Sequence, residues 1–279
     1  MDISTIIILR NIIYLKYRLK ILKTYLFIHR AHKKRNPTFA VHMLLGQDFP
    51  KIELNLNGLI ILEPNALITD FLMGSVSLYF ALKIYRNKGQ HSFLKYWYYF
   101  FLTFGLGSLL GGLAHAFFNY TGPQGKFPTW ISAILAAYFI EKAMIKSAHG
   151  LNTNNRLGKI AFVKMIFVFL IVITVISTES YQREHTIGFI PIAINTLMGV
   201  FISVAALSVY NIKKGFHDFK YLFYGVLIML PSFFVFLLKI NPVQWFDKND
   251  LSHFIIIFGI TFFYIGLKKL NYQKAPFTH

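Results

Sequence analysis

The sequence has no cysteine among its 279 residues. That absence excludes disulfide bonds, thiolate metal ligands and a cysteine nucleophile. Charge is also scarce: Asp, Glu, Lys and Arg make up 14% of the chain, against about 25% in soluble domains. With 55% hydrophobic residues and a mean hydropathy of +0.50, the chain lacks the polar surface that a water-soluble globule needs. We therefore expect an integral membrane protein.

Acidic residues are the scarcer of the two charge types, with 11 Asp and Glu against 29 Lys and Arg, and the formal net charge is +18. In a soluble protein such an excess would suggest nucleic acid as a partner. Here the basic residues fall in short segments between long apolar runs. Membrane lipids explain this distribution better, so we expect lipids and not nucleic acid as partners.

Long apolar runs dominate the chain. Crossing about 30 Å of hydrocarbon takes about 20 mostly apolar helical residues, and a helix is required because backbone groups facing lipid must be satisfied within the segment. The sequence thus predicts an all-α, polytopic seven-transmembrane-helix bundle. The predicted spans are 60–83, 97–119, 129–146, 160–178, 188–210, 220–239 and 250–268.

The loops between these spans alternate in charge. The first, third and fifth loops and the tail are rich in Lys and Arg, whereas the second loop has only Lys126 and the fourth only Arg183. Basic loops stay on the cytoplasmic side. We therefore expect a core with its N-terminal side out and its C-terminal side in, in a bacterial cytoplasmic membrane.

The N-terminal part of the chain conflicts with this orientation. Residues 1–57 form a basic segment, followed by the membrane domain at 58–270 and a short cytoplasmic tail at 271–279. One interpretation of the basic stretch is an amphipathic helix on a membrane surface. The other is that the natural start is Met43, so that residues 1–42 lie upstream of it. We favour the second, because it removes the topological conflict.

Ionisable residues inside membrane spans are costly and are candidates for function. In the predicted topology, seven polar residues lie at one depth, in the outer halves of the first, second and seventh spans. They are Glu63, Asn65, Asp70, His115, Asn249, Asp250 and His253. Ser108 lies seven residues before His115, on the same helix face as Gly111 and Gly112, which would let another helix approach closely. This arrangement predicts a polar pocket between the three helices.

Two histidines and several carboxylates at one depth could bind zinc with an open position for water. In this hypothesis His115, Asp250 and His253 are the metal ligands. Asp70 would act as general base or further ligand, and Ser108 would contact the substrate or the bound water. A zinc-bound water is the usual nucleophile of a metal hydrolase.

Each of these residues also has a structural interpretation. Asn249 or Asp250 would make a good helix N-cap, His253 an interfacial side chain, and His115 a packed side chain bonded to backbone. Glu63 before Pro64 would mark the water boundary. Glu141 and Lys164 sit near predicted cytoplasmic span ends, where snorkelling suffices to explain them.

Three segments carry a resemblance: EPNALITDF in the first span, LGGLAHAF in the second and NDLSHF opening the seventh. They resemble an uncharacterised bacterial family of seven-helix membrane proteins and, more distantly, the superfamily of alkaline ceramidases and adiponectin or progestin receptors. That superfamily holds zinc with histidines of the second and seventh helices and hydrolyses lipid amides. The resemblance implies that His115 and His253 are ligands and that Ser108 is the serine partner.

The sequence departs from the superfamily pattern in the seventh helix. The superfamily has two histidines spaced HxxxH there, whereas the residue four after His253 is Ile257. The superfamily serine also lies nearer its histidine than Ser108 does to His115, and the third span has no intramembrane Asp. A mixed His/Asp site is the most that the resemblance implies.

Three functions are therefore open. The first is a metal-dependent hydrolase of a lipid amide or ester, with its site near the outer membrane face. The second is a non-enzymatic membrane sensor or binding protein in which the His/Asp cluster is a polar lock between helices. The third, ranked last because related halves are not visible, is a small transporter.

Overall fold

The computed structural model describes residues 43–87, 91–148, 154–178 and 188–270. The chain divides into two units, residues 1–42 and 43–279, and all described residues belong to the second. The predictions made for residues 1–42, including the surface helix, and for the tail at 271–279 lie outside the described residues.

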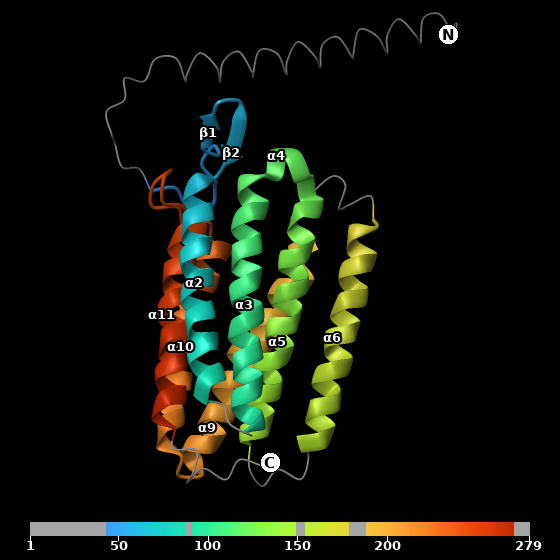
Figure 1. Cartoon of the computed structure of the whole chain (residues 1–279), viewed down its shortest axis with the longest axis vertical. Coiled ribbons are helices and arrows are strands. Elements are labelled where there is room, and N and C mark those ends of the chain that lie inside the picture. The colour runs from blue at the N-terminus through green and yellow to red at the C-terminus, as the bar shows by residue number, and fades with distance from the viewer. Residues whose placement is uncertain (1–42, 88–90, 149–153, 179–187, 271–279) are drawn as a thin grey trace, which may run out of the picture. The chain divides into compact units, whose positions relative to one another are not determined.

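Long helices running side by side make up most of the second unit (Figure 1). They are α2 (Pro64–Asn87), α3 (Ser92–Ala116), α5 (Phe127–Ser147), α6 (Asn154–Ile176), α10 (Lys220–Leu237) and α11 (Lys248–Lys269). A further helix is continuous from Ile190 to Lys213 but changes type along its length. It consists of α8 (Ile190–Thr196), the π-helical segment η3 (Leu197–Val204) and α9 (Ala205–Lys213).

Six of these helices are long and apolar enough to cross a membrane: 64–86, 92–116, 155–176, 190–213, 217–237 and 248–269. Large apolar side chains such as Leu82, Phe167 and Leu170 are exposed on their outer surfaces, as lipid-facing helices require. The predicted boundaries are right to within a few residues, except that the fourth helix begins six residues earlier, at Asn154. α5 covers the predicted third span but is not one of the six, and it carries Glu141, Lys142 and Lys146.

The helices pack as a ring. α2 contacts α3, α3 contacts α5, and α5 contacts the continuous helix of α8, η3 and α9. α10 packs against that helix and against α11, and α11 returns to α2. α6 lies outside the ring, against α5 and α8, and is the least buried of the six candidate spans.

The interior of the ring is filled with aromatic side chains. Trp97 on α3 is fully buried and makes edge contacts with Phe100 and Phe263. The sequence places Trp97 and Trp130 at span ends, where an interfacial aromatic belt would be expected. That interpretation is wrong, because both indoles are at most 5% exposed and pack in the core.

A β-hairpin precedes the first helix, where the sequence analysis had extended the first span back to residue 60. β1 (Glu53–Leu56) pairs antiparallel with β2 (Leu59–Leu62) through a turn at Asn57 and Gly58. Both turn residues have positive φ, 52° and 93°, as a two-residue type I′ turn demands. Asn-Gly between alternating apolar residues is the signal that could have predicted it. We call the end of the bundle that carries this hairpin the hairpin end.

The chain before the hairpin is tied to the loop between α10 and α11. Leu44 and Asn241 form a bridge, and the buried Asn241 amide donates to the carbonyl of Gln47 at 2.7 Å. The Asn241 side-chain oxygen accepts the backbone N–H of Lys248 at 2.8 Å. These bonds fix where α11 begins, and hence the position of Asp250 and His253.

Candidate functional site

The hairpin end brings together the first turns of α2, the last turn of α3 and the first turns of α11. Asp70, His115, Asp250 and His253 all lie in this region, as the common depth predicted from the sequence requires. They form two groups. In the first, Thr69 is hydrogen-bonded to Asp250 and His253, and Asp70 lies beside His253; in the second, Glu63 is bonded to His115.

Asp250 is fully buried and anchors the first group. The N-cap of α11 is Asp247, not Asn249 or Asp250 as proposed from the sequence. Asp250 stands at the third helical position, where its carboxylate accepts the backbone N–H of Asp247 at 3.1 Å in a capping box. The same carboxylate accepts from Asn65 at 2.6 Å and from Thr69 at 2.8 Å, both on α2. Asp250 therefore both caps α11 and bonds α11 to α2.

Thr69 connects Asp250 to His253. Its hydroxyl lies 2.8 Å from Asp250 Oδ1 and 2.9 Å from His253 Nδ1. A hydroxyl has one hydrogen, and a buried carboxylate takes the stronger hydrogen bond. Thr69 therefore donates to Asp250 and accepts from His253, which places a proton on Nδ1. This assignment leaves His253 Nε2 as the atom that faces Asp70.

The distance between His253 Nε2 and Asp70 Oδ1 is 3.5 Å, and both side chains are largely buried. With the proton of the neutral imidazole on Nδ1, these two atoms are both acceptors, so they need something between them. A proton shared by the pair would supply it, and so would a metal cation. Asp70 and His253 thus face each other with two acceptor atoms and, among the described residues, no donor between them.

Glycines of α3 make room for Asp70. A Cβ at Gly112 would lie 3.0 Å from Asp70 Cβ, and one at Gly111 would lie 3.5 Å from Asp70 Oδ2 and from Thr129 Cγ2. The close approach predicted for these glycines is confirmed. The Thr129 hydroxyl oxygen is buried and has no hydrogen-bond partner among the described residues, so it adds a further polar atom near Asp70.

His115 belongs to the second group. Its Nδ1 lies 2.7 Å from Glu63 Oε2, which is also 3.0 Å from Lys51 Nζ. Burial raises the pKa of the Glu63 carboxyl, but the hydrogen bond and charge of His115 and the charge of Lys51 outweigh it and hold the pKa at about 2. Glu63 also has a φ of 48°, a left-handed conformation that is costly for a non-glycine residue. Glu63 is therefore more than a boundary marker before Pro64.

Ser108 is hydrogen-bonded within its own helix. Its hydroxyl donates to the carbonyl of Phe104 on its own helix at 3.0 Å. Seven residues separate it from His115, which is about 10 Å along a helix axis. The role predicted for Ser108 as a substrate contact stays a prediction.

The three predicted zinc ligands do not form one cluster. Within the described ranges, no group of three or more His, Cys, Asp or Glu side chains is arranged to hold a metal ion. His115 is turned to Glu63 and Asp250 to α2, which leaves Asp70 and His253 as a pair. As arranged, the residues do not fit a zinc site, and the assignment of His115, Asp250 and His253 as ligands stays a prediction.

A third polar group, also buried, lies between α5, α6 and α8. Lys164 Nζ donates to Glu141 Oε1 at 2.5 Å and to Asn195 Oδ1 at 2.6 Å. The Lys164 side chain is only 16% exposed. Snorkelling is therefore the wrong account of Lys164 and Glu141, since the two charges pair with each other inside the bundle.

The comparisons with known proteins can now be set beside this geometry. Residues 65–272 match the model of a family described as a family of unknown function, DUF6962. The chain belongs to this family. No curated protein and no solved structure matches the chain. The DUF6962 match covers α2 to α11, so the three polar groups described above, apart from Lys51 and Glu63, lie inside the family region.

Sequence reasoning missed Thr69, the residue that joins Asp250 to His253. A signal was present, because Asn65 and Thr69 are four residues apart and so share one helix face. Both side chains of that face reach Asp250. A threonine is common in apolar helices, however, and nothing in its immediate sequence distinguishes it from a packing residue.

Proposed function

We propose that the protein is a seven-helix integral membrane protein, and that the polar groups at its hairpin end form a lock between α2, α3 and α11. In this proposal the protein is a non-enzymatic sensor or binding protein. The observation that carries the proposal is the set of side-chain bonds that join the helices: Asp250 accepts from α2 and from its own helix end, and Glu63 pairs with His115.

The seven-helix count rests on α5. Its 21 residues span about 31 Å at 1.5 Å per residue, which is enough to cross the hydrocarbon of a bilayer. α5 packs against α3, α6, α8, η3 and α9, and its Glu141 is neutralised by Lys164. Charged residues argue against a membrane span when they face lipid unpaired. In α5 the Glu141 charge is inside the bundle and is paired, so it does not argue against a span.

The orientation rests on the two ends of the bundle. The end opposite the hairpin carries several basic residues, including Lys142, Lys146, Lys213, Lys214 and Lys268. By the positive-inside rule we infer that this end faces the cytoplasm, in a bacterial cytoplasmic membrane, and that the polar lock lies near the outer face.

Thr69→Val is the sharpest test of the lock, because it keeps the side-chain shape and removes the hydroxyl that joins Asp250 to His253. Breaking buried hydrogen bonds of this kind costs about 1–3 kcal/mol. Thr103→Val is the matched control, since the Thr103 hydroxyl bonds to the Tyr99 carbonyl on its own helix. We expect a clearly lower unfolding temperature for the Thr69 variant in detergent and little change for the control.

Metal content by inductively coupled plasma mass spectrometry completes the experiment, on the wild type and on His115→Ala and His253→Ala. Substoichiometric, unchanged metal together with the Thr69 effect supports the lock. Near-stoichiometric zinc that is lost in both folded variants would overturn it, as would a Thr69 variant as stable as the control.

A metal-dependent hydrolase of a lipid amide or ester is the second candidate, favoured by one observation. Two zinc ligands about 2.0–2.1 Å from a tetrahedral ion lie about 3.3 Å apart, close to the 3.5 Å between His253 Nε2 and Asp70 Oδ1. Binding would still need His115 or Asp250 to leave its present partner. This requirement ranks the hydrolase below the lock.

A further inference from the structure

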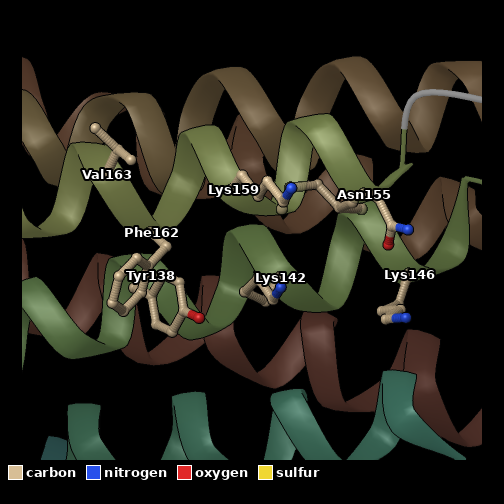
Figure 2. Close-up of a pocket in the computed structure, with 9 residues that line it drawn as sticks. Tyr138, Lys142, Lys146, Asn155, Lys159, Phe162 and Val163 are labelled. Atoms are coloured by element: carbon tan, nitrogen blue, oxygen red, sulfur yellow. The ribbon is translucent and has the colours of Figure 1, made fainter.

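A cleft lies between α5 and α6, far from the polar lock along the helices (Figure 2). Its volume is about 420 Å³. The residues that line it are Tyr138, Lys142, Ile145, Lys146, Asn155, Gly158, Lys159, Phe162 and Val163. They come from the last turns of α5 and the first turns of α6, at the end of the bundle opposite the hairpin.

The cleft is basic at one end. Lys142 and Lys146 stand one turn apart on α5, and Lys159 comes from α6. None of the described lining residues is acidic. Figure 2 shows the three lysines and Asn155 toward one end of the cleft. Such a set of donors suits an anion with several oxygens.

The other end of the cleft is apolar. Figure 2 shows Tyr138, Phe162 and Val163 there. Phe162 and Val163 are 49% and 64% exposed on the outer surface of α6, so in a membrane they would face lipid. The apolar end lies toward the middle of the helices, and the basic end lies toward the loop. This polarity matches that of a lipid whose headgroup is at the membrane surface.

Gly158 shapes the basic end. A Cβ at this position would lie 2.9 Å from Lys142 Nζ, so the absence of a side chain lets the Lys142 ammonium lie against the backbone of α6. The same ammonium lies 5.7 Å from the centre of the Tyr96 ring. Lys142 is thus held across the cleft rather than extended into solvent.

We propose that this cleft binds the phosphate headgroup of an anionic phospholipid, with an acyl chain lying along Phe162 and Val163. The proposal rests on the membrane insertion stated above and is independent of the polar lock. Basic pockets between transmembrane helices on the cytoplasmic side are suited to such headgroups. Free phosphate would bind the lysines but would make no contact with the apolar end of the cleft.

The test uses the full chain in nanodiscs of phosphatidylcholine with or without phosphatidylglycerol, and native mass spectrometry to count retained lipids. The variant Lys142→Gln/Lys146→Gln/Lys159→Gln removes the basic end. Lys213→Gln/Lys214→Gln/Lys268→Gln is the control, because it removes the same charge from the same end of the bundle. Each basic residue near an anionic surface contributes about fivefold, so we expect retention of phosphatidylglycerol to fall about a hundredfold in the cleft variant and to hold in the control.

Gly158→Leu adds a variant that leaves every charge in place. Its side chain would fill the basic end and should also reduce phosphatidylglycerol retention. Equal retention by wild type, the cleft variant and Gly158→Leu would overturn the proposal, as would equal loss in the control. Competition by inorganic phosphate as strong as that by the lipid would assign the cleft to free phosphate instead. Failure of the chain to enter nanodiscs would reject membrane insertion itself, whereas failure of the lock would appear in the Thr69 stability and metal-content measurements and would leave lipid retention unchanged.

Discussion

Replacing Lys164 by methionine should destabilise the protein by more than most single substitutions. The change keeps much of the side-chain volume but leaves Glu141, which is only 6% exposed in its side chain, without its cation. It also removes the donor to Asn195. Removing one partner of a buried ion pair costs about 3–5 kcal/mol, because the remaining charge is buried without compensation.

The double variant Lys164→Met/Glu141→Leu separates this cause from a simple loss of attraction. Replacing both members of a buried pair by apolar residues is often neutral, so the double variant should recover most of the stability. Unfolding free energies from SDS titrations in mixed micelles, followed by circular dichroism, would measure both, with the exposed Lys159→Met as control. A single variant as stable as the control, or a double variant no better than the single, would refute the reasoning.

Two further predictions concern the hairpin end and the contact between α2 and α3. Folding lowers the pKa of the Glu63 carboxyl from 4.5 to about 2. The ionised carboxylate therefore contributes about 3 kcal/mol to the free energy of unfolding. This contribution is complete above about pH 4.5 and is lost as the pH falls toward 2. Unfolding temperatures between pH 6 and 3 should therefore decline more steeply for the wild type than for Glu63→Gln, and parallel curves would contradict this. Gly105→Ala would place a Cβ 2.8 Å from Leu78 Cγ and should lower the free energy of unfolding by about 1–3 kcal/mol. The Cβ of Gly111→Ala would meet only ordinary contacts at 3.5 Å. That variant should therefore be neutral or slightly stabilising in the same thermal assay. Equal effects of the two glycine variants would show that the close approach does not set the cost.

The long helices could be predicted because each one depends on its own composition. Apolar runs of about 20 residues fix where a span lies, and the alternation of basic loops put Asp70, His115 and His253 at one depth before any contact was known. In the structure these side chains lie at one end of the bundle. Depth is a property of each segment, so it needs no knowledge of how the segments pack.

Partners could not be predicted, because they depend on rotation about each helix axis. The sequence indicates that Asp250 lies at the start of a helix, but not that Thr69 and Asn65 point toward it from α2. Lys164 and Asn195 are 31 residues apart, and only the packing of α6 against α8 brings them to 2.6 Å. Hydropathy also extended the first span into the hairpin, because Leu59–Leu62 is apolar in either conformation.

The π-helical segment η3 has a consequence for how one helix presents its polar side chains. Asn195 precedes the segment and accepts from Lys164, and Asn211 follows it and donates to Ser147 of α5 at 3.0 Å. In an uninterrupted α-helix, residues 16 positions apart point about 160° away from each other, so Asn195 and Asn211 would lie on nearly opposite sides of the helix. The eight π-helical residues turn less per residue, because each hydrogen bond spans one residue more. They take up most of that angular offset, and a single helix can therefore direct an amide to Lys164 and another to Ser147 at two levels along its axis.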